Sequence, residues 1–374
     1  MTPFGISIPG RIVFGRGEAA KAPALIAAYG LRGVVVHGAN ADRAVWLTHG
    51  LRAVGCSVLA LPCAAEPTLS ILEQSVIAAR SHGADWVVAL GGGAALDLGK
   101  AVAALIPAPG GAMDHLEVVG RGLPLAAGPL PFIAMPTTSG TGAEVTKNAV
   151  IGLPDHARKV SLRDDRMLAR LAIIDPALTD HCPRGITLAS GLDAITQVIE
   201  PYVSCKATPF TDALCLPAIP LGLEALKRLM QGEDAHARDD MAWVSLCGGL
   251  ALANSGLGAV HGLAGVIGGT TGAAHGAICG ALLGPVLAMN RDRGAGDKLG
   301  RVLGMIADVH GGPDAPRRLM DWAYAQGLAQ LSALGVPATD HRAIAEASLA
   351  ASSMKGNPVS LSVDDLVRVM ESAG

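Results

Sequence analysis

Hydrophobic and polar positions alternate in blocks through the first half of the chain. Six short apolar runs indicate β-strands, at residues 11–15, 34–36, 57–61, 86–90, 132–135 and 172–175. Apolar residues at helical spacing between them predict helices at residues 17–30, 42–54 and 68–82, the first closed by Gly30. Strands that alternate with helices are typical of a parallel sheet with helices on both faces. We therefore expect an α/β domain in this half.

Strand patterns cease after about Pro183. From Gly185 to Ser372 the chain shows long apolar helical segments separated by Gly and Pro residues. This change predicts an α/β domain over residues 1–183 and an all-helical domain over residues 184–374. The length of 374 residues is sufficient for two separate cores.

One apolar stretch raises the question of a membrane span. Residues 241–290 contain no Asp, Glu, Lys or Arg, and long apolar stretches of this kind are typical of transmembrane helices. The same stretch carries twelve Gly together with Asn254, His261 and His275. Polar residues are rare inside membranes, and a helix with apolar residues on all sides also fits a buried position in a soluble domain. We expect buried helices and no membrane partner.

Composition narrows the class of protein further. Half of the residues are hydrophobic and 16% are charged, which indicates a folded chain. The net charge of −3, the absence of a Lys/Arg cluster and the few aromatic residues argue against nucleic acid as a partner. Seven cysteines without a CxxC pair are typical of reduced cytoplasmic thiols, and the N-terminal residues show no secretory signal.

Two loops are candidates for cofactor binding. Gly91, Gly92 and Gly93 close a strand and open a helix that contains Asp97, an arrangement in which glycines let the backbone approach a pyrophosphate. A tight strand-to-helix turn without a ligand needs the same glycines. The second loop, residues 136–146, places several hydroxyl side chains beside two glycines, which suits phosphate, ribose or adenine. A turn that only caps the next helix has a similar composition.

Four longer motifs carry a family resemblance: GGGAALDLGK (residues 91–100), PTTSGTGAEVT (136–146), GLDAITQVIEPYVS (191–204) and GAVHGLAGVIGGTTGAAHG (258–276). Together with Glu66-Pro67-Thr68 and residues 354–358, they follow the order and approximate spacing of the iron-containing (group III) alcohol dehydrogenase family. The chain resembles this family over nearly its whole length. The resemblance implies a dehydroquinate synthase-like architecture: a nucleotide-binding α/β domain, an all-α domain, and an active site in the cleft between them.

The resemblance also implies the residues that bind the cofactor. Gly91, Gly92, Gly93 and Asp97 belong to the pyrophosphate element, and Thr137, Thr138 and Thr141 to the adenosine and phosphate region. Lys159 matches a lysine that contacts the nicotinamide ribose, although a solvated surface lysine is the ordinary role of this residue type. Many members hold the ribose with an Asp after the second strand, where this chain has Gly38. Without that carboxylate a 2′-phosphate is not repelled, so we expect NADP as well as NAD.

The metal site implied by the resemblance departs from the family at one position. Members bind iron or zinc through one Asp and three His; Asp193, His261 and His275 match three of these ligands, and Gln197 stands at the fourth position. An amide oxygen is a weaker ligand than imidazole, so we expect weak metal binding. Each His taken singly also fits a buried core position. We expect Gly268 and Gly269 to interrupt the chain between the two His.

A further departure concerns proton transfer. Many metal-dependent members have another His four residues after His261, where this chain has Gly265. Since alcohol oxidation must remove a poorly acidic proton and carbonyl reduction does not, both departures favour reduction. We expect an NAD(P)-dependent alcohol dehydrogenase or carbonyl reductase, with His261 and His275 at the catalytic centre.

Three other functions remain open. The first is a metal-independent reductase of the maleylacetate type. The second is a dehydroquinate synthase-like lyase, against which the lack of Lys and Arg over residues 241–290 argues. The third is a non-catalytic binding protein. The apolar composition suits a small alcohol or carbonyl substrate, and the resemblance implies a homodimer or higher homo-oligomer.

Overall fold

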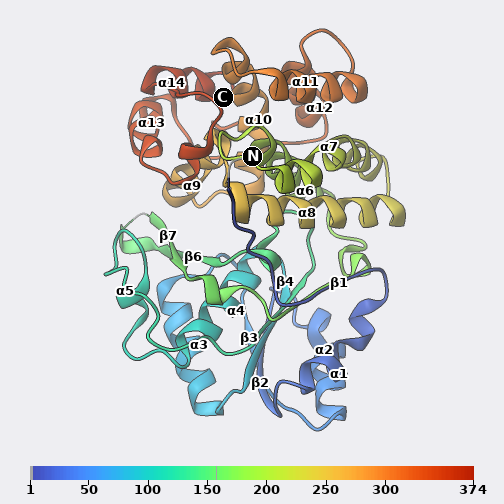
Figure 1. Cartoon of the computed structure of the whole chain (residues 1–374), viewed down its shortest axis with the longest axis vertical. Helices are drawn as coiled ribbons and strands as arrows, with labels where there is room; N and C mark the ends of the chain where they lie inside the picture. Colours follow the sequence, from blue (N-terminus) through green and yellow to red (C-terminus); the bar gives the residue numbers. More distant parts are fainter. Residues whose placement is uncertain (1–2, 157) are drawn as a thin grey trace. The chain divides into compact units, whose positions relative to one another are not determined.

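The computed structural model describes residues 3–156 and 158–374 (Figure 1). Its helices are α1 (Ala22–Ala27), α2 (Asp42–Ala53), α3 (Leu69–His82), α4 (Gly93–Leu105), α5 (Ala112–His115), α6 (Arg184–Val203), α7 (Pro209–Leu229), α8 (Ala235–Ser255), α9 (Ala259–Thr271), α10 (His275–Asp292), α11 (Asp297–His310), α12 (Ala315–Ala325), α13 (His341–Leu349) and α14 (Val363–Glu371). Its strands are β1 (Ile12–Phe14), β2 (Arg32–His37), β3 (Ser57–Pro62), β4 (Trp86–Gly91), β5 (Phe132–Pro136), β6 (Asn148–Leu153), β7 (Arg158–Arg163) and β8 (Leu171–Ile174).

The chain divides into two compact units, which we call the sheet unit and the helical unit. The sheet unit comprises Ser7–Thr138 and Ala143–Thr179. The helical unit comprises the segment that ends at Ile6, the short segment Ser139–Gly142, and Asp180–Gly374. The segment Ser139–Gly142 lies in the middle of the predicted cofactor loop, so this loop contributes residues to both units.

The sheet unit is built on six strands in the order β1-β8-β5-β4-β2-β3. All of their pairings are parallel. The helix after β2 leads to β3 on one side, whereas the helix after β4 leads to β5 on the other. The order of connections therefore reverses between β2 and β4, and ligands of open α/β sheets bind at the carboxyl ends of the strands at such a point.

Successive residues of the central strands face opposite sides of this sheet. Val35, Val88 and Ile133 belong to a core that includes residues of α1 and α2. On the other face α4 lies close to the strands: a Cβ at Gly99 would lie 2.8 Å from the Cβ of Ala89. Helices thus cover both faces (Figure 1), and the predicted parallel α/β fold is confirmed.

Two local predictions for this unit need correction. The single helix expected at residues 17–30 is a short 3₁₀ helix, Glu18–Lys21, followed by α1. Because Pro23 has no N–H to donate, it suits only the first turn of a helix, where it lies. The antiparallel hairpin β6–β7 was not predicted. The alternating burial of Asn148–Leu153 is the signal that the apolar-run criterion missed.

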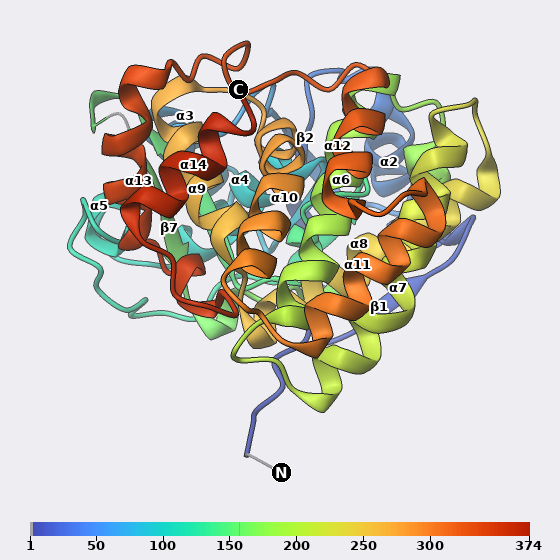
Figure 2. The ribbon, with the colours of Figure 1, turned by 90° about the horizontal axis from the view of Figure 1, so that it is seen from above.

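In the described part of the chain, all regular secondary structure after β8 is helical, as predicted. Small residues allow two of these helices to approach closely: a Cβ at Gly276 would lie 2.5 Å from the carbonyl oxygen of Ala189, and one at Gly280 would lie 2.8 Å from Leu192. The glycines of α10 therefore hold it directly against α6 (Figure 2). This packing brings the chemistry-bearing residues of the two helices together.

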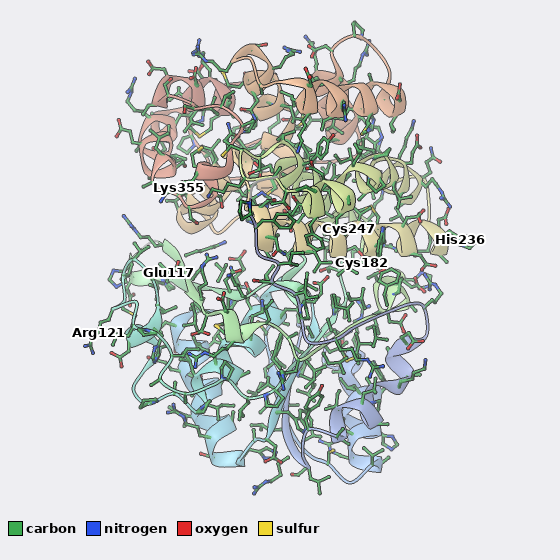
Figure 3. All side chains as sticks on the ribbon, viewed as in Figure 1. Glu117, Arg121, Cys182, His236, Cys247 and Lys355 are labelled. Atoms are coloured by element: carbon green, nitrogen blue, oxygen red, sulfur yellow. The ribbon has the colours of Figure 1, made fainter. Side chains whose placement is uncertain are left out.

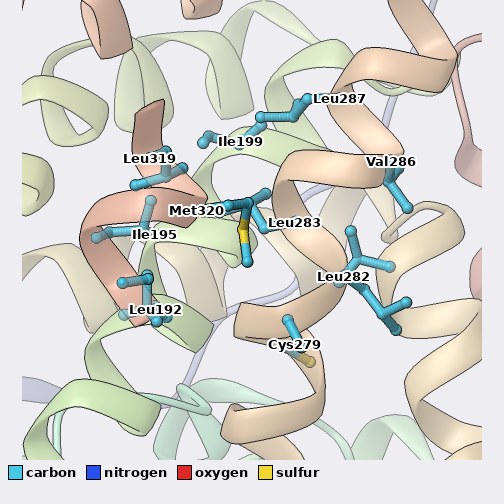
Figure 4. Packing of buried hydrophobic residues seen from close by; sticks show 14 of the residues in the cluster. Leu192, Ile195, Ile199, Cys279, Leu282, Leu283, Val286, Leu287, Leu319 and Met320 are labelled. Atoms are coloured by element: carbon cyan, nitrogen blue, oxygen red, sulfur yellow. The ribbon is translucent and has the colours of Figure 1, made fainter. Parts of the chain in front are cut away.

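Apolar side chains fill the rest of the helical unit. Figure 4 shows part of this core, in which residues of α6, α10 and α12 interdigitate: Leu192, Ile195, Ile199, Cys279, Leu282, Leu283, Val286, Leu287, Leu319 and Met320. No single helix in the described ranges is long and apolar enough to cross a membrane; the pair α8 and α9 passes together but is bent by 97°.

None of the seven cysteines forms a disulfide. Cys205 is exposed and the other six are buried. Cys182 and Cys247 are labelled in Figure 3, which shows the side chains of both units. Burial raises the pKa of the Cys247 thiol to about 12, so this thiol stays protonated and acts as a small apolar residue.

Candidate active site

The glycine turn of the sheet unit forms an anion-binding helix start. Gly92 is the N-cap of α4, and the Thr137 N–H donates to the carbonyl oxygen of Gly91 (3.0 Å). A Cβ at Gly91 would lie 2.6 Å from the Cβ of Ala95, so only glycine fits there. The free N–H groups and the positive end of the α4 dipole favour a phosphate group at this position.

Gly38 and Thr138 flank this turn. Gly38 follows β2 directly, and its backbone N lies 3.3 Å from where a Cβ of Gly91 would stand. A Cβ at Gly92 would lie 3.2 Å from the Thr138 hydroxyl oxygen. These residues therefore gather at the carboxyl ends of β2 and β4, where the strand connections reverse direction.

The remaining predicted cofactor residues lie in different settings. Lys159, on β7, forms an ion pair with Glu66 and is 15% exposed, so it is not a freely solvated lysine. Asp97 accepts a hydrogen bond from the Val150 N–H (3.1 Å) and thereby fastens β6 to α4. Thr141 belongs to the helical unit. The three predicted threonines are thus divided between the two units.

The metal-ligand candidates of the helical unit converge from three helices. Asp193 of α6, His261 of α9 and His275 of α10 contribute ligand atoms that, together with Cys279, all lie within 4.8 Å of one another. The His261 Nε2 lies 3.3 Å from Asp193 Oδ1, and the His275 Nε2 lies 3.9 Å from the same oxygen. Asp193 and His261 are buried, whereas 34% of the His275 side chain is exposed. Access to the cluster is therefore from the side of His275.

Polar residues on one face of α6 help to orient the metal-ligand candidates. Asp193, Gln197 and Glu200 share one helix face, since they are four and three residues apart. Glu200 accepts hydrogen bonds from the Val260 N–H (2.7 Å) and from the His261 Nδ1 (2.7 Å). With Nδ1 occupied in this way, the Nε2 of His261 turns toward Asp193. Carboxylates in this position fix the orientation of metal-binding histidines in many proteins.

Asn357, in the motif of residues 354–358, stabilises the start of α9. The Asn357 side-chain oxygen accepts from the Ala259 N–H (3.2 Å), and its amide nitrogen donates to Asn290 (2.8 Å). Residues almost one hundred positions apart therefore fix the first turn of α9, on which His261 lies.

The buried polar atoms of the cluster fit a cation. Asp193 Oδ1, Gln197 Oε1 and His261 Nε2 are buried and have no hydrogen-bond partner among the described residues. Unpaired buried polar atoms are costly and are usually satisfied by water, an ion or a ligand. A divalent cation bound by Asp193 Oδ1 and His261 Nε2 would satisfy two of these atoms. The residues present are thus suited to a metal.

Acidic groups outnumber basic groups around the cluster. Burial raises the pKa of Asp193, but His261 and His275 lower it more, so the net shift is downward. The pKa of His275 is raised to about 9, first by its interaction with Cys279. Burial lowers the pKa of His261, but Cys279, Glu200 and Asp193 raise it further, well above its usual value. A pocket that holds positive charge this strongly suits a dication.

One prediction about the helices that carry the two histidines is wrong. Gly268 and Gly269 do not interrupt the chain: α9 runs through both and ends at Gly272, whose φ of 70° reverses the backbone. His275 then begins α10, and the two imidazole rings lie 5.4 Å apart. A glycine is free to stay helical, and only the C-terminal capping position requires a left-handed conformation.

Family models match both parts of the chain. The model of the iron-containing alcohol dehydrogenases matches residues 9–176, and the model of the C-terminal region of Fe-containing alcohol dehydrogenases matches residues 187–374. The chain belongs to the iron-containing alcohol dehydrogenase family. The resemblance inferred from the motifs is thereby confirmed.

Individual members of the iron-containing alcohol dehydrogenase family align at moderate identity. The long-chain-alcohol dehydrogenase 1 of Geobacillus thermodenitrificans is 42% identical over 205 residues, 54% of this chain and 51% of that relative. The probable alcohol dehydrogenase EutG of Escherichia coli is 31% identical over 332 residues, 87% of this chain and 82% of that relative. A crystal structure of 1,3-propanediol oxidoreductase superposes with a TM-score of 0.89 at 26% identity and full coverage of both chains.

Relatives are named as alcohol dehydrogenases, and one of Escherichia coli as a lactaldehyde reductase, as expected for the iron-containing alcohol dehydrogenase family. Two residues of the cluster were not predicted from the sequence. Glu200 follows Asp193 by seven positions, a helical spacing that would have revealed it. Cys279 follows His275 by four positions, but as an isolated cysteine in an apolar run it resembled a core residue.

Proposed function

We propose that this chain is an NAD(P)-dependent alcohol dehydrogenase or carbonyl reductase that holds a divalent metal through Asp193, His261 and His275. The convergence of these three side chains carries the proposal, since their donor atoms lie within 4.8 Å of one another. When bound, the nicotinamide would exchange a hydride with the substrate carbon and the metal would polarise the substrate oxygen.

The chain's own residues supply binding and orientation. The N-terminus of α4, with Gly91, Gly92 and Gly93, would bind the pyrophosphate, and Thr137, Thr138 and Thr141 the adenosine and phosphate region. Lys159, paired with Glu66, would contact the nicotinamide ribose. Glu200 holds His261 in the orientation that presents Nε2 to the cluster.

Carbonyl reduction is the proposed preferred direction. Gln197 stands where the family has a third histidine, and Gly265 of α9 is exposed, with open space where a side chain would begin: a Cβ there would meet no atom within 4 Å. The chain therefore has less means of withdrawing a proton from an alcohol than a member with both histidines. Reduction of an aldehyde or ketone requires only a hydride donor and a modest electrophile.

The test is NADH and NADPH oxidation with a panel of small aldehydes and ketones, before and after dialysis against a chelator. We expect turnover that falls on chelation and returns with added metal, and His261→Ala should reduce it by about 100-fold or more, the scale typical for loss of a key polar group. Turnover that continues unchanged in metal-free protein would assign the chain to metal-independent reductases of the maleylacetate type. If no carbonyl is reduced, the proposed function is wrong.

A further inference from the structure

The cluster contains one more strong metal ligand than the family pattern provides. Cys279 lies one helical turn after His275 on α10, and its Sγ is 3.6 Å from the His275 Nε2. The side chain is fully buried. Figure 4 shows it at the end of the apolar group, away from Leu287 and Val286. The thiol thus lies between the hydrophobic core and the metal-ligand candidates.

The donor atoms lie close to the spacing that one metal ion requires. Zinc–nitrogen and zinc–oxygen bonds of about 2.0–2.1 Å and a zinc–sulfur bond of about 2.3 Å require donor separations of about 3.3–3.6 Å. The observed separations are 3.3 Å between His261 and Asp193, 3.6 Å between Cys279 and His275, and 3.9 Å between His275 and Asp193. Two of these separations fall in that range and the third is slightly longer, so small shifts of the side chains would bring the donors onto one ion.

Gln197 is the competing candidate for the fourth position. It lies one helical turn after Asp193, so the two side chains share a face of α6. A neutral amide oxygen is a poorer ligand for zinc than a thiolate. Gln197 is therefore a weaker candidate for the fourth ligand than Cys279.

We propose that the Cys279 thiolate completes a ligand set with Asp193, His261 and His275, and that this set selects zinc or cobalt(II) over iron(II). Two histidines and one carboxylate alone suit iron(II), whereas an added thiolate favours zinc. The proposal rests on the metal role proposed above for Asp193, His261 and His275. It replaces the expectation of weak binding, which considered residue 197 only.

The binding step is a ligand exchange without oxidation or reduction. The Cys279 thiol loses its proton to solvent, its sulfur lone pair forms the bond to the divalent ion, and a water molecule leaves the ion. Six thiols elsewhere in the chain provide internal controls. Among them, Cys215 lies buried in α7 of the same unit, and burial raises the pKa of its thiol.

The test is cobalt(II) titration of the metal-free full-length protein, with absorbance recorded in the near ultraviolet, where thiolate-to-cobalt charge transfer appears. We expect the band in wild type, in Gln197→Ala and in the control Cys215→Ala, and its loss in Cys279→Ala. Zinc affinity, measured by competition with a chelating dye, should fall by about 100-fold or more in Cys279→Ala and by about tenfold in Gln197→Ala, the range found for ligands and their supporting residues. Circular dichroism would establish that each variant is folded.

Cobalt that binds wild type stoichiometrically without the band, or a band that persists in folded Cys279→Ala, would overturn the proposal. If Cys279→Ala does not fold, alkylation of wild type decides the question. Because Cys279 is buried, it reacts only when the protein opens transiently, so modification is followed under mild denaturant that makes its rate measurable. Zinc should then slow modification of Cys279, mapped by peptide mass, and leave that of exposed Cys205 unchanged; equal measurable rates with and without zinc would contradict metal ligation. None of these readouts depends on turnover. A failed carbonyl assay with the charge-transfer band present would therefore refute the proposed function and leave this ligand set intact.

Discussion

At the scale of single residues, we propose that Gly38, at the carboxyl end of β2, influences which coenzyme binds. A Cβ at Gly38 would meet no atom within 4 Å, so a larger side chain fits there without rearrangement. We expect Gly38→Asp to shift the ratio of kcat/KM for NADH over that for NADPH upward by about tenfold or more, because a carboxylate accepts from the ribose 2′-OH and repels a 2′-phosphate.

The matched control for this change is Gly300→Asp. Gly300 lies on α11 and also has open space around its Cβ position, but it belongs to the helical unit. This variant should leave the coenzyme ratio unchanged. A wild type that prefers NADH a hundredfold, about 2.7 kcal/mol, would show that Gly38 does not permit NADPH.

Lys159 carries the second prediction at this scale. Its ion pair with Glu66 and its low exposure distinguish it from a solvated lysine. Lys159→Ala should raise the KM for the coenzyme by about tenfold, the loss of one charge-assisted hydrogen bond, with little effect on stability. Lys147→Ala is the control, since Lys147 pairs with Asp165 in the same unit. Equal coenzyme KM values in both variants would show that the ion pair of Lys159 with Glu66 has only a structural role.

At the scale of elements, a buried lysine ties α4 to the segment that precedes β6. The Lys100 ammonium donates to the Ala143 carbonyl oxygen (2.7 Å), the Thr146 hydroxyl (3.0 Å) and the Asn148 carbonyl oxygen (2.8 Å). Burial lowers its pKa to about 8, and nearby Asp97 and Glu144 oppose this shift. The Lys100 side chain thus donates hydrogen bonds to the segment before β6, which has no partner strand of its own in the described part of the chain.

Lys100→Met should therefore lower the free energy of unfolding by about 3–5 kcal/mol, because three acceptors lose their donor and the charges of Asp97 and Glu144 lose a nearby cation. Lys21→Met is the control: Lys21 is 64% exposed and pairs with Glu18 on the surface, so its loss should cost less than about 1 kcal/mol. Urea unfolding of both variants measures the difference. Similar small losses of unfolding free energy in both variants would mean that water molecules enter and donate to the acceptors that Lys100 leaves.

The elements themselves were largely predictable. Each of the six apolar runs overlaps a strand of the parallel sheet. The runs in β2, β4, β5 and β8 are buried, as expected of strands that are covered on both faces. The hairpin β6–β7 was missed, since only every second residue of its strands is buried. The end of α9 at Gly272 was also missed: several glycines precede it within the helix, and packing alone decides which of them caps.

At the scale of the whole molecule, one histidine makes stability depend on pH. His310 of α11 packs against Trp322 of α12 with ring centroids 4.9 Å apart, and its Nε2 is buried without a partner among the described residues. Burial, together with the charge of Lys227, lowers the pKa of His310 to about 4. Its value in the unfolded chain is about 6.5.

The folded state therefore resists protonation of His310 while the unfolded state accepts it. This contribution to stability is fully present above about pH 6.5 and is lost as the pH falls toward about 4, by about 1–3 kcal/mol in total. His310→Gln should flatten the dependence of the unfolding free energy on pH in this window. His49→Gln, on exposed His49 of α2, should leave it unchanged. If the two variants give the same slope, His310 is not the titrating group.

The sequence by itself determined the class of each half and the family, because strand and helix periodicity and co-linear motifs are local properties of the chain. It also singled out Asp193, His261 and His275, since these residues lie within recognisable motifs. Only the tertiary structure decided that Glu200 holds His261 and that Cys279 joins the cluster. Those contacts depend on how closely α6, α9 and α10 approach one another, and that distance is set by glycines whose role is visible only when the helices are packed.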